Sequence, residues 1–298
     1  MTEDLDKALA AVDINPAQIQ IGKKIGNGST AAVFRGQYSG KDVAIKEIFA
    51  SESKAAEMKQ ELAFQREVAI MSKVKHENLV AFYGVCFSTH PLRLVTEFCA
   101  GGNLFQLLHM KPDVALCWGQ SFKMCRDVAN AMDYLHSFSP KIIHRDLKSL
   151  NLLLAQEVGS FKDVPLLKVS DFGMAKMREE TDAGTVWYNM TNGAGTCHWM
   201  APEVITGSYN EKADVYSYGI VIFEICCREI PFEDEDGKDV VSLIQQGARP
   251  DLDAIHPDCP EVLQKLMPLC WAHNPAKRPS FTQVLKALAT VDMGPKWR

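Results

Sequence analysis

The chain has 298 residues, of which 47% are apolar and 23% charged, so it is long enough to form a large hydrophobic core and two lobes or domains. Its formal net charge of −5 excludes a general electrostatic attraction to nucleic acid or to anionic lipid. No apolar run approaches the roughly 20 residues that a membrane-spanning helix needs.

The N-terminus and the cysteines predict the compartment. The first ten residues, MTEDLDKALA, are acidic and lack the apolar core of a secretion signal. The nine cysteines are scattered, odd in number and without a C-x-x-C pair, which favours free thiols over disulfides or a zinc site. We therefore expect a cytoplasmic location, with the nucleus as the alternative.

The first third of the chain predicts a short helix and then mainly strands. Residues 2–18 have Leu5, Leu9 and Val12 at helical spacing, which indicates a short amphipathic helix. The region 19–48 contains three strand patterns, IQIGKKIG, AAVFRGQY and DVAIKEI, with a turn before the third.

A helix and two further strands complete this region. Residues 53–74 predict a helix, because Phe64, Val68 and Met71 form an apolar stripe along it. The two strands that follow are expected at 79–87 and 92–98.

The pattern becomes helical after residues 97–102. The segment 213–227 is apolar nearly all round, so we expect a helix buried in the middle of a lobe. The other helices are expected at 118–137, 239–246, 260–270 and 280–290.

Three features of the strand-rich third suggest a phosphate site. Gly26 and Gly28 let the backbone approach a bound phosphate, although a hairpin turn explains a lone G-x-G equally well. Lys46 ends the apolar strand VAIK, and an inward lysine there needs an anion unless it extends to the surface. Glu67, beside the apolar stripe of its helix, offers that anion, unless it is an exposed glutamate of a charged helix.

Two later motifs decide between these alternatives. The stretch 143-IHRDLKSLNLLL-154 contains H-R-D-x-K-x-x-N, and D-F-G follows 25 residues after its aspartate, in 169-VSDFGMAK-176. Further landmarks come in order: APE at 201–203, DVYSYG at 214–219, and Arg278 in NPAKRPSF. With these motifs the chain resembles the eukaryotic protein kinases from about Ile19 to Leu288.

The resemblance implies an α+β, bilobal protein-kinase fold. Its N-lobe would be a small antiparallel β-sheet with one major helix, and its larger C-lobe would be mainly α-helical. The expected boundaries are an N-terminal extension at 1–18, the N-lobe at 19–96, a hinge at 97–102, the C-lobe at 103–290 and a C-terminal tail at 291–298.

The resemblance also implies the chemical roles. Asp146 would accept or orient the proton of a substrate hydroxyl, and Lys148 would neutralise the γ-phosphate of ATP. Lys46, positioned by Glu67, would hold the α- and β-phosphates. The metal ligands would be Asn151 and Asp171, which suit Mg²⁺ or, as a substitute, Mn²⁺.

The remaining ATP contacts follow from the same resemblance. Val33, Ala44 and Leu153 would sandwich the adenine, and backbone groups of Glu97 and Cys99 would meet its edge. The full set, with Thr96 as the gatekeeper residue, is Ile25, Gly26, Asn27, Gly28, Val33, Ala44, Lys46, Thr96, Glu97, Cys99 and Leu153.

Other motif residues are expected to be structural rather than catalytic. They are a stack of Met71, Phe82, His144 and Phe172, an ion pair of Glu203 with Arg278, and Asp214 as the buried anchor of the catalytic-loop backbone.

The motifs favour an active enzyme that modifies serine or threonine. Ala31 replaces the third glycine of the phosphate-loop pattern, a mild departure, and every other expected catalytic residue is present. Lys148 and 195-GTCHWMAPE-203 resemble serine/threonine kinases, whereas YGVC and CWAHNPAKRPSF resemble the tyrosine-kinase-like group, which includes Raf-like and mixed-lineage-like enzymes. The alternatives are some tyrosine activity or a catalytically silent kinase-fold scaffold.

Regulation is expected on the activation segment, about residues 171–203. Arg145 precedes the catalytic aspartate and would bind a phosphate there. The candidate acceptors are Thr181, Thr185, Tyr188 and Thr191, of which Thr191 is favoured, modified by an upstream kinase or by autophosphorylation in trans. The expected partners are protein substrates, without nucleic acid.

Two runs depart from the kinase pattern. Residues 155–165 are longer than their connection needs and predict a surface excursion, with a docking role left open. The acidic run at 233–239 predicts a solvated loop, and attraction of basic substrates is the alternative.

Overall fold

The computed structural model of the protein describes residues 11–28, 30–50, 53–87, 89–177, 197–205, 207 and 210–291. The chain divides into two compact units. The first comprises residues up to Ala100 together with Phe172–Met174, and the second comprises Gly101–Asp171 and the chain from Ala175 onward. The predicted α+β kinase fold is confirmed, and the division falls inside the segment predicted as a hinge.

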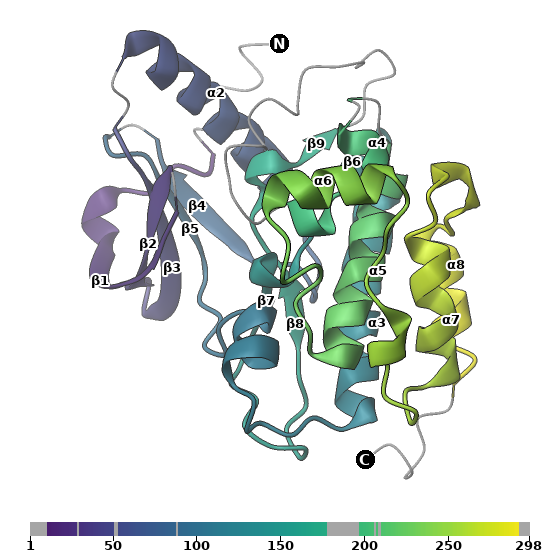
Figure 1. Ribbon diagram of the computed structural model, residues 1–298. Coiled ribbons are helices and arrows are strands. Elements are labelled where there is room, and N and C mark those ends of the chain that lie inside the picture. The colour runs from purple at the N-terminus through teal and green to yellow at the C-terminus, as the bar shows by residue number, and fades with distance from the viewer. Residues whose placement is uncertain are drawn as a thin grey trace. The chain divides into compact units, whose positions relative to one another are not determined.

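The first unit is built on a five-stranded antiparallel sheet within the described residues (Figure 1). Its order is β1-β2-β3-β5-β4, so all five strands predicted from the sequence are present. A turn at Ser39 and Gly40 joins the second and third strands, and both residues have positive φ (51° and 74°). The strands are β1 Ile19–Asn27, β2 Ala31–Tyr38, β3 Lys41–Ile48, β4 Phe82–Cys86 and β5 Arg93–Glu97.

Helix α2, Lys54–Met71, is the major helix of this unit. Ser53 caps its N-terminus by accepting a hydrogen bond from the Ala56 amide at 3.3 Å. The predicted stripe of Phe64, Val68 and Met71 is buried. The position and inward face of this helix were therefore predicted correctly.

The helix predicted at 2–18 is wrong over residues 11–15, whereas residues 2–10 lie outside the described part. Ile14 is buried, and its amide donates to the Val85 carbonyl at 2.6 Å. A 3-10 helix spans only Pro16–Gln18. The residue before a proline disfavours the helical conformation, and pairing with β4 satisfies the backbone instead.

The second unit is mainly helical, and the predicted helices are all present (Figure 1). Helix α5, Lys212–Cys227, is buried along most of its length and packs against α3 and α7, as its apolar sequence predicted. Among the described residues, no helix is long and apolar enough to cross a membrane. The other predicted helices are α3 Trp118–His136, α6 Gly237–Gln245, α7 Glu261–Cys270 and α8 Phe281–Leu288.

Short elements that the sequence analysis did not predict frame the loop at 144–151. Strand β6, Ile142–Ile143, pairs with β9, Lys176–Met177. Strand β7, Leu152–Leu154, pairs with β8, Leu167–Val169. The loop thus runs from one two-stranded sheet to another, which fixes both of its ends. A π-helix at Gln106–Met110 and the short helix α4 at Pro202–Ile205 were also missed.

Candidate active site

Lys46 and Glu67 form an ion pair in the first unit. The lysine Nζ lies 2.9 Å from Glu67 Oε1 and 3.2 Å from Oε2. Lys46 comes from β3, opposite Val33 and Leu94, and Glu67 comes from α2, where it is buried. The predicted pairing is therefore present, and the alternatives of a surface lysine and an exposed glutamate are wrong.

Gly26 and Gly28 differ from a glycine that the fold requires. A Cβ atom added to Gly22 would lie 2.8 Å from the Arg35 carbonyl oxygen, so the sheet leaves no room for a side chain there. At Gly26 and Gly28 the nearest atoms would be 3.5 Å away, which is ordinary contact. The folded chain alone does not explain glycine at these two positions, and the close approach of a phosphate to the backbone stays a prediction.

The other predicted ATP contacts of this unit lie on or after its strands. Ile25 and Asn27 are exposed on β1, whereas Val33 and Ala44 are half-buried on β2 and β3. Thr96 and Glu97 end β5, followed by the buried Cys99. The predicted adenine sandwich also needs Leu153, half-buried on β7 of the second unit, and it stays a prediction.

Asp146 is the centre of the polar cluster in the second unit. Its Oδ2 atom lies 2.9 Å from Lys148 Nζ and accepts a hydrogen bond of 2.8 Å from the Asn151 side-chain amide. Its Oδ1 atom is buried and has no hydrogen-bond partner among the described residues. Buried polar atoms are normally satisfied, so this oxygen marks a position where a bound donor would be stabilised.

Asp214 anchors the loop that carries Asp146. Its carboxylate accepts hydrogen bonds of 2.9 Å each from the backbone amides of His144 and Arg145, and lies 2.9 Å from His136 Nε2. Burial alone would raise the pKa of this carboxyl, but the hydrogen bond from His136 and the charges of His136 and His144 hold the pKa below its ordinary value of 3.8. The predicted anchor is present, and it holds Arg145 at a left-handed φ of 68°.

His144 is engaged with the backbone through both ring nitrogens. Nε2 lies 2.9 Å from the Ser170 carbonyl oxygen, and Nδ1 lies 3.4 Å from the Asp146 amide. The ring is completely buried. These contacts support the structural role expected for His144. The predicted stack with Met71, Phe82 and Phe172 involves both units and stays a prediction.

Asn151 and Asp171 lie at the open end of the β7–β8 pair. The Asn151 carbonyl oxygen accepts hydrogen bonds from the Ser170 amide at 2.9 Å and the Ser170 hydroxyl at 2.8 Å. Asp171 follows Ser170 directly, is exposed, and has a left-handed φ of 60°. The amide nitrogen of Asn151 is used by Asp146, so its amide oxygen is the atom that could bind a metal.

The side chains of Asn151 and Asp171 suit Mg²⁺, which substrate phosphates help to bind, better than a metal ion bound by protein side chains alone. Within the described ranges, no group of three or more His, Cys, Asp or Glu side chains could hold a metal ion. Mg²⁺ is typically bound by one or two carboxylates together with water and substrate phosphates. One carboxylate and one amide oxygen therefore suit a metal that arrives with a phosphorylated ligand.

The predicted Glu203–Arg278 ion pair is also present, and Glu203 is the last residue of the segment 171–203. The Arg278 guanidinium is buried, donates to Glu203 Oε2 at 2.8 Å and lies over the Tyr216 ring at 5.1 Å. It also donates to the carbonyl oxygens of Lys212 and Ala272, at 2.9 and 2.7 Å. The arginine therefore braces the segment that carries α4.

Among the buried polar groups that sequence reasoning missed is Glu224, near the C-terminal end of α5. Its carboxylate accepts hydrogen bonds from the Trp199 indole and the Ser149 hydroxyl and lies near His109. The available signal was an acidic residue inside the apolar run IVIFEICC at 220–227, which should have required partners.

The two runs that depart from the kinase pattern lie on the surface. In 155–165 the loop is held to α3, because Gln120 Nε2 donates to the carbonyl oxygens of Ser160 and Asp163 at 2.8 Å each. It borders a groove of about 720 Å³ with the exposed Phe161 and Val164. In the acidic run, residues 233–236 are exposed, as expected for a solvated loop, and α6 begins at Gly237.

The proposed regulatory acceptors cannot be placed. Thr185 and Thr191 lie outside the described residues, as does most of the activation segment. Their modification therefore stays a prediction.

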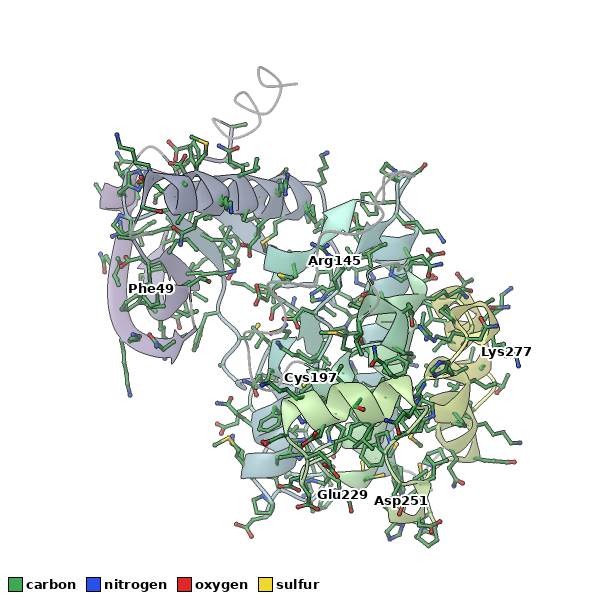
Figure 2. All side chains as sticks on the ribbon, turned by 45° about the horizontal axis from the view of Figure 1, so that its top comes forward. Phe49, Arg145, Cys197, Glu229, Asp251 and Lys277 are labelled. Carbon is green, nitrogen blue, oxygen red and sulfur yellow. The ribbon has the colours of Figure 1, made fainter. Side chains whose placement is uncertain are left out.

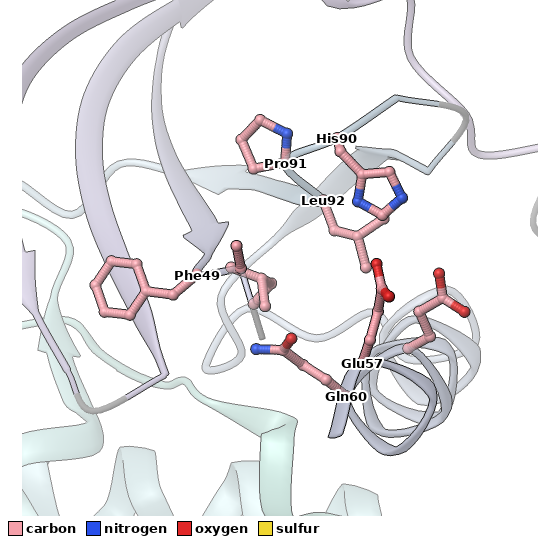
Figure 3. A pocket seen from close by; sticks show the side chains of 9 residues that line it. Phe49, Glu57, Gln60, His90, Pro91 and Leu92 are labelled. Atoms are coloured by element: carbon pink, nitrogen blue, oxygen red, sulfur yellow. The ribbon is translucent and has the colours of Figure 1, made fainter. Parts of the chain in front are cut away.

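A separate pocket of about 390 Å³ lies in the first unit (Figure 3). Glu57 and Gln60 of α2 face it from one side, and His90 and Leu92 face it from the segment before β5. Phe49, directly after the end of β3, also lines it. None of the motif residues lines this pocket, so it is distinct from the candidate active site.

Comparison with known families agrees with this geometry. The model of the family described as protein tyrosine and serine/threonine kinase matches residues 19–288, so the chain belongs to that family. The boundaries of the match coincide with the predicted extent of the kinase resemblance, which is thereby confirmed.

Several curated proteins are similar over more than nine-tenths of the chain. Serine/threonine-protein kinases STY17 and STY46 of Arabidopsis thaliana are 39% and 36% identical over 93% and 94% of it. Dual specificity protein kinase pyk3 of Dictyostelium discoideum is 39% identical over 92%. The chain spans less than half of these relatives, 45%, 45% and 19% of their lengths.

Proposed function

We propose that the protein transfers the γ-phosphate of MgATP to serine or threonine hydroxyls of protein substrates. The observation that carries this proposal is the buried Oδ1 atom of Asp146, which has no hydrogen-bond partner among the described residues. Lys148 and Asn151 hold the other carboxylate oxygen, so the carboxylate is fixed and the first oxygen is left for a ligand donor. A substrate hydroxyl supplies such a donor.

The residues of this chain divide the reaction between them. Asp146 orients the attacking hydroxyl and accepts its proton, while Lys148 offsets charge on the transferred phosphoryl group. Lys46, held by Glu67, binds the phosphates of ATP, and the backbone at Gly26 and Gly28 approaches them.

The metal requirement is part of the same proposal. Protein kinases generally use ATP and Mg²⁺. Asn151 and Asp171 would hold the ion, or Mn²⁺ in its place. When bound, the metal would neutralise phosphate charge.

Regulation and location complete the proposal. Phosphate on Thr191 or Thr185 would pair with Arg145, whose backbone is already fixed by Asp214. The phosphate would come from an upstream kinase or from autophosphorylation in trans. The cytoplasm, or alternatively the nucleus, is the proposed location because a protein with nine free thiols suits a reducing compartment.

Incubation of the purified protein with labelled MgATP and a generic basic protein tests the activity. Asp146→Asn should lower the rate by about 10²–10⁴-fold, the usual contribution of a general base. Lys46→Met should also lose activity and reduce the thermal stabilisation given by MgATP, because it weakens nucleotide binding. Asp234→Asn, an exposed aspartate of the second unit, is the control.

The same assay separates the alternatives. Equal labelling by wild type and Asp146→Asn would assign the activity to a contaminant and favour the silent scaffold. Phosphotyrosine in the hydrolysed product, beside phosphoserine or phosphothreonine, would support dual specificity, as in the name of the Dictyostelium relative.

A further inference from the structure

Glu224 is a charged residue completely buried within α5. Desolvation raises the pKa of its carboxyl, and the hydrogen bonds from His109, Ser149 and Trp199 oppose that increase. A buried acidic side chain adds little to stability compared with an apolar residue of similar size. Stability therefore does not explain why an acidic residue lies in this apolar part of α5.

Three side chains distant in sequence meet at this carboxylate. Trp199 Nε1 donates to Oε2 at 2.6 Å, and the Ser149 hydroxyl donates to Oε1 at 2.5 Å. His109 Nε2 lies 3.2 Å from Oε1. The partners are 25, 75 and 115 residues away along the chain, so Glu224 is a junction of separate segments.

Two of these segments flank the candidate chemistry. Ser149 begins the 3-10 helix Ser149–Asn151, directly after Lys148 and three residues after Asp146. Trp199 ends the 3-10 helix Cys197–Trp199, which leads into α4. Because both side chains bind one carboxylate, their polar atoms are held within about 7 Å of each other.

The segment at 197–199 has further attachments to the helices around it. The Trp199 carbonyl oxygen accepts a hydrogen bond of 2.8 Å from the Ser217 hydroxyl, so backbone and side chain of Trp199 are both tied to α5. Cys197 lies beside α6 (Figure 2). Ser149 lies three residues after Asp146, so the loop that carries Asp146 and the 197–199 segment meet at one carboxylate.

We propose that Glu224 is a positioning residue that couples the catalytic loop to the 197–199 segment and so aligns a protein substrate with Asp146. This inference rests on the proposed kinase activity. Through Ser149, Glu224 sets the turn that carries Asn151 and thereby affects kcat. Through Trp199, it sets the surface alongside the substrate and thereby affects the KM for the protein substrate.

Steady-state kinetics of six variants test this coupling, with KM for peptide, KM for MgATP, kcat and Tm measured for each. Glu224→Leu should raise the peptide KM and lower kcat, each about tenfold, with the MgATP KM changed less than about twofold. Glu224→Gln should stay within about threefold of wild type, because its amide oxygen accepts from Trp199 and its amide nitrogen donates to the Ser149 oxygen.

The effects on the peptide KM and on kcat should separate in the variants of Trp199 and Ser149. Trp199→Phe removes the indole donor and should mainly raise the peptide KM, whereas Ser149→Ala should mainly lower kcat. The effects of the double variant should be less than multiplicative, because both act through Glu224. Glu229→Leu, which replaces an exposed glutamate just after α5 (Figure 2), should match wild type.

The outcomes distinguish this inference from the proposed function. Wild type no more active than Asp146→Asn would overturn the kinase proposal itself. An active wild type with a folded Glu224→Leu variant of unchanged peptide KM and kcat would overturn only the positioning role. If Glu224→Leu does not fold, fully multiplicative effects of Trp199→Phe and Ser149→Ala would overturn it.

Discussion

Asp214 is a single side chain on which the catalytic loop depends. Its carboxylate is fully buried and satisfies two consecutive backbone amides that no helix or strand satisfies. Removing the charge would leave donors of His144 and Arg145 poorly paired in the interior, which is expensive. The residue therefore contributes to stability and to the geometry of the loop together.

The lowered pKa of Asp214 predicts a pH dependence. A carboxyl with a depressed folded-state pKa contributes stability that is fully present above its ordinary pKa of 3.8 and is lost as the pH falls through the lower folded value. At pH 7, Asp214→Asn should reduce the free energy of unfolding by about 3 kcal/mol. In urea titrations, the difference between wild type and variant should shrink below pH 3.8.

Asp234→Asn serves as the control for this prediction, because Asp234 is exposed in the same unit. It should leave the free energy of unfolding nearly unchanged at every pH. A difference between wild type and Asp214→Asn that stays constant down to pH 3 would contradict the assigned pKa shift.

At the scale of elements, Arg278 joins three parts of the second unit. It binds Glu203 in α4, the Lys212 carbonyl at the start of α5 and the Ala272 carbonyl just after α7. The planar guanidinium supplies donors in several fixed directions, which a lysine ammonium cannot reproduce. The arrangement of these elements thus depends on arginine rather than on positive charge alone.

Arg278→Lys should therefore behave as a severe substitution. We expect a loss of about 3 kcal/mol in the free energy of unfolding, measured by urea titration, because the half-buried Glu203 carboxylate and two carbonyl groups lose hydrogen bonds from a buried guanidinium. Lys277→Ala, at the exposed neighbouring position (Figure 2), should change it by less than about 0.5 kcal/mol. Equal stability of Arg278→Lys and wild type would show that the brace is dispensable.

For the whole molecule, the cysteines give a global test of the fold. All nine positions lie within the described ranges, and each is a free thiol. Six are buried, whereas Cys117, Cys197 and Cys227 are intermediate. A thiol-specific reagent should therefore label at most three thiols rapidly in the native protein and nine in denaturant, with Tm unaffected by reductant. Fast labelling of more than three would contradict the buried positions.

Much of the fold and the site could be predicted from sequence because the signals were local. The apolar stripe of α2, the uniformly apolar α5 and the contiguous catalytic motif each lie within one segment. The pairing of Lys46 with Glu67 followed from the resemblance and from the need of a buried carboxylate for a cation.

What could not be predicted depended on contacts between distant segments. Residues 11–15 pair with β4 instead of continuing a helix, and no local pattern indicates that partner. The partners of Glu224 could not be predicted from the sequence either, because Ser149 and His109 are 75 and 115 residues away. The unsatisfied Oδ1 of Asp146 likewise emerges only once its neighbours are placed.

The long-range anchoring of the catalytic loop has a consequence for the order in which the molecule matures. The contacts that hold His144 and Ser149 come from Asp214 and Glu224, 70 and 75 residues later in the chain. Synthesis proceeds from the N-terminus, so a nascent chain displays the whole His-Arg-Asp motif well before these carboxylates exist. The loop backbone is then unsupported until α5 emerges and docks. The geometry of the loop at 144–151 is therefore completed only after α5 has been synthesised and packs against it.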